Sequence, residues 1–381
     1  MRPVIMPIYG TRPEAIKMAP VIAALQESDV FDCKVVSTGQ HREMLDQVNH
    51  LFGIEPDIDL NIMRPNQGLC GILTRTIDGL DELFKEEKPA AVIVQGDTTT
   101  VTAGALAAFY HSIPVIHIEA GLRSHNLFSP FPEEANRKLT TQISSLHCAP
   151  TSVSKQNLLD EAVNPDDIVI TGNTVIDALL TTVEKQVPFS DPQLEELAAS
   201  GKQVMLVTTH RRENQGDAMR GVGRAIARIA RANPELQIVL PAHKNPVVRE
   251  AVLPALEGLD NIVVTEPLAY GEFTRMLSLA HIVLTDSGGV QEEAPSLGKP
   301  VLVMRENTER PEAVDAGTVL LIGTDEERIV EEVTKLLTNE EHYNTMANAV
   351  NPYGDGLAAK RTVAAIAELL GVGKRMDEFT S

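Results

Sequence analysis

The sequence lacks the features that mark several large classes of protein. Its 381 residues contain three cysteines, Cys33, Cys70 and Cys148, with no CxxC spacing, which excludes a disulfide framework and a cysteine-rich zinc site. It has no run of 18 apolar residues and no signal-like succession at its beginning. We therefore expect neither a membrane span nor secretion, and a cytoplasmic location fits best. Low-complexity tracts and short-period repeats are also absent.

Positive charge is scarce as well. The chain has 33 Lys and Arg residues against 53 Asp and Glu residues, a formal charge of −20. A protein with this charge repels nucleic acid and anionic lipid, so any anion that it binds must be held by a local cluster of cations. No P-loop, GxGxxG, HExxH or EF-hand motif occurs. The sequence therefore requires no metal ion, and it disfavours Walker-type and nicotinamide nucleotide sites.

The pattern that is present is a regular alternation of short apolar runs and longer amphipathic stretches. This alternation is typical of βαβ units and of a parallel sheet covered on both faces. It starts again after a polar stretch at 185–202, so we predict an α/β fold with two Rossmann-like domains facing a central cleft. The predicted domains are residues 1–185 and 186–356, and a helical segment at 357–381 either packs on the second domain or returns to the first. The predicted strands include 33–36, 91–94, 114–118, 203–207, 237–240, 262–265, 282–284 and 300–303.

The first polar motif, GTRPEAIK, follows the apolar run 4–9. Thr11 and Glu14 have capping-box spacing, and Pro13 suits a first helical turn, so a structural reading explains part of it. It does not explain Arg12 and Lys17. A helix start offers free N–H groups and partial positive charge, and two added cations make it an anion site.

A second motif, TDSGGVQEE, follows the predicted strand 282–284. Gly288 and Gly289 after Ser287 allow a ligand to approach the backbone closely, although a tight turn alone would use the same residues. Glu293 lies about one turn into the following helix. A carboxylate there suits a ribose diol, as acidic residues do in other nucleotide sites.

Three carboxylates follow other predicted strands or open helices. They are Asp97, Glu119 and Glu133. Taken singly, Asp97 could cap a helix, and Glu133 with Glu134 could serve a helix amino terminus. If they converge, mutual repulsion raises at least one pKa, and the group can act as a general acid or base.

Cations and one histidine follow strands in the second half. His210 stands in THRREN, beside Arg211 and Arg212, and Arg310 follows the predicted strand 300–303. A single histidine is more often structural than catalytic, whereas a histidine with two arginine neighbours at the carboxyl end of a strand fits either role. Carboxylates in the first domain and phosphate ligands in the second indicate chemistry on a sugar attached to a nucleoside diphosphate.

These segments, with others, resemble one known family. The stretches GTRPEAIKMAP, GQHREMLDQV, GDTTT, HIEAGLRS, FPEEANR, TGNTVIDAL, THRREN, TDSGGVQEEAPSLGKPVLVMRENTERPEAV and NPYGDG are similar, in one order, to the non-hydrolysing UDP-N-acetylglucosamine 2-epimerase family. They run from residue 10 to residue 356, so the resemblance covers nearly the whole chain.

The resemblance implies a glycosyltransferase-B-like fold, usually a homodimer, that interconverts UDP-GlcNAc and UDP-ManNAc without metal or other cofactor. A base removes the C2 proton as UDP leaves C1, and re-protonation of the bound 2-acetamidoglucal on its other face precedes the return of UDP. UDP-ManNAc usually feeds surface polysaccharide. By motif position, the acid/base carboxylates are Asp97, Glu119 and Glu133, the essential histidine is His210, and the UDP ligands are Arg12, Lys17, Ser287, Gly288, Gly289, Glu293 and Arg310, with Phe273 as a wall for the uracil.

Bacterial members of the family also resemble one another in a second, activating UDP-GlcNAc site. Its lining would here include Gln40, His41, Glu43 and His243. Glu43 stands where some members have Gln, and Asn66 where some have Arg, and both differences disfavour a second diphosphate. Other readings stay open at this point: a hydrolysing epimerase that releases ManNAc and UDP, a retaining glycosyltransferase, a UDP-sugar-binding regulator, or an epimerase for another UDP-sugar.

Overall fold

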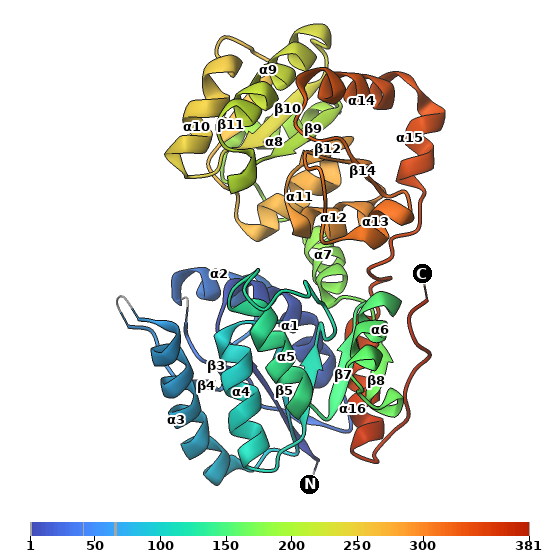
Figure 1. Cartoon of the computed structure of the whole chain (residues 1–381). Coiled ribbons are helices and arrows are strands. Elements are labelled where there is room, and N and C mark those ends of the chain that lie inside the picture. Colours follow the sequence, from blue (N-terminus) through green and yellow to red (C-terminus); the bar gives the residue numbers. More distant parts are fainter. Residues whose placement is uncertain (1, 41, 65–66, 381) are drawn as a thin grey trace. The chain divides into compact units, whose positions relative to one another are not determined.

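The computed structural model describes residues 2–40, 42–64 and 67–380, with only the backbone of Arg42 and Glu43. The chain divides into two compact units (Figure 1). The first comprises the residues up to Ala178 together with Tyr353–Thr380, and the second comprises Leu179–Pro352. The divisions after Ala178 and after Pro352 lie a few residues before the predicted domain ends at 185 and 356. No helix in the described ranges has the length and apolar character needed to cross a membrane.

The first unit is built on a parallel sheet with the strand order β4-β3-β1-β5-β6-β7-β8, and β2 also pairs with β1. The strands are β1 (Val4–Tyr9), β2 (Asp32–Cys33), β3 (Val36–Ser37), β4 (Ile58–Asp59), β5 (Ala91–Gln95), β6 (Val115–Ile118), β7 (Leu146–Ala149) and β8 (Ile168–Ile170). Its helices are α1 (Arg12–Gln26), α2 (Arg42–Phe52), α3 (Leu69–Glu87), α4 (Thr99–Tyr110), α5 (Glu133–Ile143), α6 (Ser152–Asp160) and α16 (Ala358–Leu369), and α7 (Thr174–Glu184) contains the division between the units.

The prediction of one strand at 33–36 is wrong. β2 and β3 are separate two-residue strands that pair with opposite ends of β1. Between them, the backbone N–H of Val35 donates to the Asp57 carboxylate at 2.7 Å. The pairing with β1 is therefore interrupted between Cys33 and Val36.

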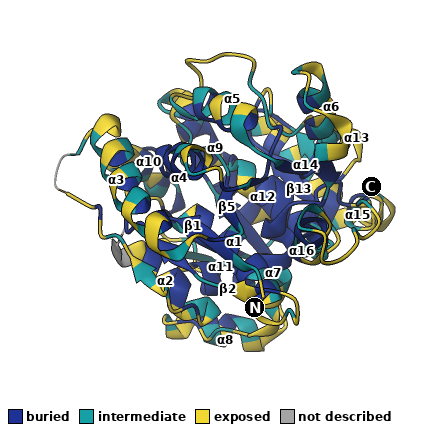
Figure 2. Ribbon diagram, turned by 90° about the horizontal axis from the view of Figure 1, so that it is seen from below, coloured by how far each residue is buried: buried dark blue, intermediate teal, exposed yellow. Residues whose placement is uncertain are grey.

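The core of the first unit explains its apolar strands. β5 is buried along its whole length, and Figure 2 shows the strands dark blue and the outer residues of α3 yellow. On one face, Leu80 and Phe84 of α3 and Val101 of α4 pack with Val92 and Val94 of β5. The helix α16 packs on α1 and β7, so a segment from the end of the chain completes this unit.

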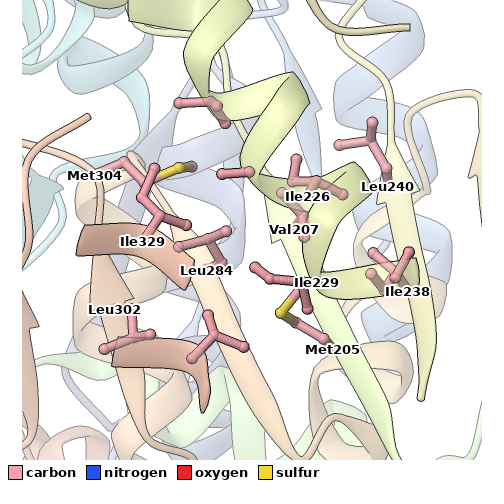
Figure 3. Close-up of a cluster of buried hydrophobic side chains, with 14 of the residues drawn as sticks. Met205, Val207, Ile226, Ile229, Ile238, Leu240, Leu284, Leu302, Met304 and Ile329 are labelled. Carbon is pink, nitrogen blue, oxygen red and sulfur yellow. The ribbon is translucent and has the colours of Figure 1, made fainter. Parts of the chain in front are cut away.

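The second unit repeats the arrangement with the parallel strand order β11-β10-β9-β12-β13-β14. Its strands are β9 (Val204–Thr208), β10 (Gln237–Pro241), β11 (Ile262–Thr265), β12 (Ile282–Thr285), β13 (Val301–Val303) and β14 (Val319–Leu321). Its helices are α8 (Pro192–Ser200), α9 (Asp217–Ala232), α10 (Pro246–Val252), α11 (Tyr270–Leu279), α12 (Gly288–Glu293), α13 (Pro311–Asp315), α14 (Glu326–Thr338) and α15 (Glu340–Ala347). Figure 3 shows the buried cluster in which Ile226 and Ile229 of α9 and Ile329 of α14 cover Met205 and Leu284.

The strand orders place one reversal in each sheet. After β1 the chain adds β3 and β4 on one side and then crosses to β5 on the other, and β12 stands in the same relation to β9. Loops after the two strands at such a reversal diverge, which opens a binding crevice at their carboxyl ends. The loops after β1 and β5, and those after β9 and β12, are therefore where ligands are expected in each unit.

Candidate functional site

In the first unit, Glu14 ties together the loops that follow β1 and β5. Its carboxylate accepts the N–H groups of Gly10 at 2.6 Å and Thr11 at 2.9 Å, and also the hydroxyl of Thr98. The side chain is buried, and burial raises the pKa of Glu14 to about 7 despite these hydrogen bonds. The sequence predicted only a helix cap, whereas the structure adds a link to the loop that carries Asp97.

Glu119 lies at the centre of the polar cluster at this edge of the sheet. Its carboxylate receives the Lys17 ammonium at 2.5 Å, the Gln95 amide at 2.5 Å and the Asn173 amide at 3.2 Å. Its backbone has φ +62°, a left-handed conformation that is unusual outside glycine. Such strain is typical of functional residues that the surrounding fold holds in place. Lys17, predicted as a phosphate ligand, is thus the ion-pair partner of a predicted acid/base residue.

Asp97 has a cation partner of its own. The Arg137 guanidinium donates to Asp97 Oδ2 from Nε at 3.0 Å and from Nη2 at 2.6 Å. The amide of Asn136 donates to the Asp97 backbone carbonyl at 2.8 Å. The alternative that Asp97 caps α4 is wrong, because Thr98 is the N-cap and accepts the N–H of Val101 at 3.3 Å.

The two glutamates that open α5 have different environments. Glu134 is buried and accepts the N–H groups of Ser124 at 2.9 Å and His125 at 3.1 Å, so it anchors the loop before the helix. Glu133 is half-buried, and within the described residues no hydrogen bond or ion pair joins it to Asp97 or Glu119. The structure therefore connects Asp97 with α5 through Arg137. That Glu133 acts together with Asp97 and Glu119 stays a prediction.

The sequence analysis did not identify His117 as a functional residue. This buried side chain on β6 hydrogen-bonds through Nε2 to the Gly96 carbonyl at 2.7 Å, beside Asp97. Burial lowers the pKa of His117 to about 4, so the ring is neutral at pH 7. Its only sequence signal is its place in the HIEAGLRS motif.

In the second unit, the strand ends at β9 and β12 meet through Asp286. This fully buried carboxylate accepts the Thr209 hydroxyl at 2.9 Å and lies 3.1 Å from Nδ1 of His210. The His210 side chain remains 41% exposed. Asp286 was outside the set of predicted site residues, although it stands in the quoted TDSGG motif.

Two guanidinium groups lie beside the start of α12. A Cβ placed on Gly288 would be 3.6 Å from Nη2 of Arg211 and 3.9 Å from Cζ of Arg310. A Cβ on Gly289 would meet no described atom within 4 Å, so the space beside it is open to a ligand. Ser287 precedes these glycines as the N-cap. Two guanidinium groups beside a helix start suit an anion, and the roles of Gly288, Gly289 and Arg310 as phosphate ligands stay a prediction.

The remaining predicted nucleotide residues lie on α1, α11 and α12. Glu293 is buried at the end of α12, where its carboxylate accepts the Tyr270 hydroxyl at 3.0 Å. Phe273, one turn further along α11, is half-exposed. Arg12 is the first residue of α1 and is half-buried.

A cavity of about 500 Å³ in the second unit is lined by His210, Arg211, Arg212, Glu213, Gln215, His243 and Asn245. The rings of His210 and His243 are nearly parallel, with centroids 5.7 Å apart. His243, predicted for a second nucleotide-sugar site, thus shares this cavity with His210. Gln40 is in the first unit and accepts the Thr100 hydroxyl at 2.7 Å. His41, Asn66 and the Glu43 side chain lie outside the described residues.

Comparison with known proteins gives a consistent result. The family model described as UDP-N-acetylglucosamine 2-epimerase matches residues 23–367. The chain is 54% identical to UDP-N-acetylglucosamine 2-epimerase of Escherichia coli K12, over 95% of this chain and 98% of that protein. It is similar to the crystal structure of UDP-GlcNAc 2-epimerase from Neisseria meningitidis bound to UDP-GlcNAc, with a TM-score of 0.83 and 49% identity, covering 96% of this chain and all of that one. A glycosyltransferase from Rickettsia africae shares the fold at 12% identity, with a TM-score of 0.61 and coverage of 97% and 99%. The predicted α/β fold with two Rossmann-like domains, similar to glycosyltransferases of the B type, is confirmed.

Proposed function

The chain belongs to the UDP-N-acetylglucosamine 2-epimerase family, and on that premise we propose that it is an isomerase that reversibly converts UDP-GlcNAc to UDP-ManNAc at C2. The observation that carries the proposal is the pairing of two carboxylates with two cations at neighbouring strand ends, Glu119 with Lys17 and Asp97 with Arg137. Carboxylates held in this way can exchange a proton with a bound sugar without reorganising the site.

The proposed reaction is an elimination followed by a re-addition. A carboxylate takes the C2 proton, the C2–H electron pair forms the C1=C2 bond, and the C1–O bond breaks to release UDP. The products are a bound 2-acetamidoglucal and UDP. Protonation of C2 on its opposite face and return of the UDP oxygen to C1 give the epimer. Asp97, Glu119 and Glu133 are the proposed proton carriers.

Departure of UDP must be strongly stabilised, because no carbonyl group next to C2 acidifies its proton. In the second unit, Arg211 and Arg310 lie beside the start of α12. We propose that they hold the diphosphate with His210, Ser287, Gly288 and Gly289, while Arg12 and Lys17 contribute from α1, Glu293 binds the ribose and Phe273 covers the uracil. Cations and helix N–H groups stabilise the charge that develops on the leaving oxygen.

Further parts of the proposal rest on the family resemblance. They are a homodimeric assembly, a cytoplasmic location, independence of metal and nicotinamide cofactors, and supply of ManNAc-type sugars for surface polysaccharide. A second, activating UDP-GlcNAc beside His243 is part of the same proposal. It predicts that UDP-GlcNAc accelerates the reverse reaction, and a hyperbolic forward rate curve with no such acceleration would contradict it.

The test is proton NMR of the protein with UDP-GlcNAc in deuterated water with chelator. The expected result is deuterium at C2 in a mixture of UDP-GlcNAc and UDP-ManNAc. Accumulation of free ManNAc and UDP would instead establish the hydrolysing reaction. An unchanged spectrum would contradict this epimerase activity and direct the search to other UDP-sugars, to glycosyl transfer or to binding without turnover.

A matched control separates the site from a general effect of removing a carboxylate. Asp81 of α3 is ion-paired with Lys85 at 2.6 Å on an exposed surface. Asp97→Asn should abolish deuterium incorporation, whereas Asp81→Asn should leave it unchanged.

A further inference from the structure

Asp286 has no role in the reaction proposed above, although its carboxylate accepts several hydrogen bonds beside the proposed diphosphate ligands. It directly follows β12, its side chain has no exposed surface, and its donors come from the loop after β9. A buried carboxylate is costly unless its charge is compensated, so its retention at this position requires an explanation.

The two oxygens of Asp286 have different partners. Oδ2 accepts the Thr209 hydroxyl at 2.9 Å and the N–H groups of His210 at 2.9 Å and Arg211 at 3.0 Å. The Asn214 amide also donates to Oδ2, at 3.4 Å. Oδ1 is 3.1 Å from the His210 backbone nitrogen and 3.1 Å from Nδ1 of the His210 ring. Burial acts to raise the pKa of Asp286, but hydrogen bonds from the His210 side chain and the two backbone N–H groups outweigh it, and the pKa is lowered.

These partners determine which ring nitrogen of His210 carries a proton. An ionised carboxylate only accepts hydrogen bonds, so Nδ1 must be the donor. In the neutral ring Nε2 is then unprotonated, and this is the nitrogen left for a ligand. The ring lines the cavity described above, beside the nearly parallel ring of His243.

The backbone carbonyl of Asp286 also orients the side chain of Arg211. The Asp286 carbonyl accepts Nε of Arg211 at 3.2 Å, and the other end of that guanidinium lies beside Gly288. Asp286 thus contacts the side chain of His210 through its carboxylate and the side chain of Arg211 through its main-chain carbonyl. Both contacted side chains are proposed diphosphate ligands.

We infer that Asp286 is a positioning residue for the proposed reaction: it holds His210 with its proton on Nδ1, so that Nε2 is presented to the oxygen of the departing diphosphate. When Nε2 binds a proton from solvent, which reaches the 41% exposed ring, the imidazolium donates from both nitrogens. Nε2–H then donates to the diphosphate oxygen, and the Asp286 carboxylate faces the positive charge of the ring from the Nδ1 side. Fixing a histidine through its second nitrogen is a general way to set its tautomer and orientation. The inference rests on the proposed function, because the diphosphate is the ligand that gives Nε2 its task.

Asp286→Asn tests the inference with little change of shape. Backbone N–H groups cannot become acceptors, and Oδ2 receives those of both His210 and Arg211, at shorter distances than the single 3.1 Å contact of Oδ1. The asparagine oxygen should therefore take the place of Oδ2, and its NH₂ group then faces Nδ1 of His210. We therefore expect the proton of His210 to move from Nδ1 to Nε2. Proton–nitrogen correlation spectra of histidine-labelled protein report the tautomer directly, and His210→Asn identifies the signal by its loss.

The expected result is a wild-type His210 ring protonated on Nδ1, a ring protonated on Nε2 in Asp286→Asn, and a fall in kcat of about 10- to 100-fold, as for other residues that orient a functional group. Adding Asp286→Asn to the His210→Asn variant should lower kcat very little further, because a positioning residue acts only through its partner. Thr209→Val is the matched control. It removes one donor to Asp286 at 2.9 Å without altering the contact with Nδ1, so the tautomer should not change.

A wild-type ring protonated on Nε2 would overturn the inference, and this measurement does not depend on whether Asp286→Asn folds. The inference would also be overturned if Asp286→Asn lowered kcat by the same factor in the wild-type protein and in the His210→Asn variant. The tautomer is read in the protein without substrate, whereas the proposed function is tested by deuterium at C2. A result that contradicts the His210 tautomer is therefore distinguishable from one that contradicts the proposed reaction.

Discussion

Gly121→Ala provides a stringent test of how the fold holds Glu119. Gly121 has φ +89°, and a Cβ added to it would lie 2.2 Å from the Ser154 carbonyl oxygen and 2.8 Å from its carbon. A left-handed conformation costs an L-residue about 1–2 kcal/mol, and overpacking costs about 1–3 kcal/mol. We therefore expect the substitution to lower the free energy of unfolding by about 2–5 kcal/mol.

Gly53→Ala is the matched control in the same unit. Gly53 has φ +67° but no atom within 4 Å of an added Cβ among the described residues, so only the conformational cost of about 1–2 kcal/mol should remain. Thermal unfolding followed by far-UV circular dichroism measures both variants, at about 2–4 °C per kcal/mol for a unit of this size. If the two variants unfold at the same temperature, the contact with Ser154 has no energetic consequence and the reasoning fails.

Activity should respond to Gly121→Ala as well. Glu119 lies two residues earlier with φ +62°, and the loop after it is held by a 3.1 Å hydrogen bond from Ala120 to Cys148 and a 2.9 Å hydrogen bond from Asn157 to Gly121. Movement of this loop shifts Glu119 away from Lys17, and a displacement of about 1 Å can lower turnover about 100-fold. UDP affinity should stay within a few fold, because most proposed diphosphate ligands are in the second unit. Gly53→Ala should retain normal turnover.

Three further predictions concern the polar cluster of the first unit. Because burial lowers the pKa of His117 to about 4, this residue contributes stability that is complete above pH 6.5 and is lost as the pH falls towards 4, about 3 kcal/mol in total. The urea midpoint of His117→Gln should accordingly fall less than that of the wild type between pH 7 and pH 5, and parallel curves would contradict the assignment. The pKa of Glu14 is raised to about 7, so its contribution to stability is complete below pH 4.5 and is lost as the pH rises through 7. Glu14→Gln should therefore gain stability relative to the wild type between pH 5 and pH 8, and a constant difference in urea midpoint would refute this. Asp97→Asn should abolish turnover while calorimetry finds UDP affinity within a few fold of the wild type, and near-normal turnover would remove Asp97 from the mechanism.

The sequence by itself determined the class of fold and the edge of each sheet where polar residues gather. Continuous apolar runs such as Val92–Val94 require burial on both faces, and the chain between them can supply only helices to cover those faces. Gly288 and Gly289 after a strand likewise predicted a close approach to a ligand. These conclusions follow from local composition and period, which the sequence displays directly.

Only the tertiary structure decided which side chains meet. Lys17 and Glu119 are 102 positions apart, and Asp97 and Arg137 are 40 apart, so no local pattern joins them. Their contacts depend on the adjacency of β1, β5 and β6 in the sheet, which is a property of the whole topology.

The same reason explains the residues that sequence analysis missed. Glu14 and Asp286 stand in motifs that look sufficient as a helix cap and a glycine turn, and their burial becomes visible only when a second loop lies against them. The sequence specified the elements and the chemistry available at their ends. Packing of distant strands then decided which charges are paired, which are buried and which face a ligand, because electrostatic partners are set by distance in space and not by separation along the chain.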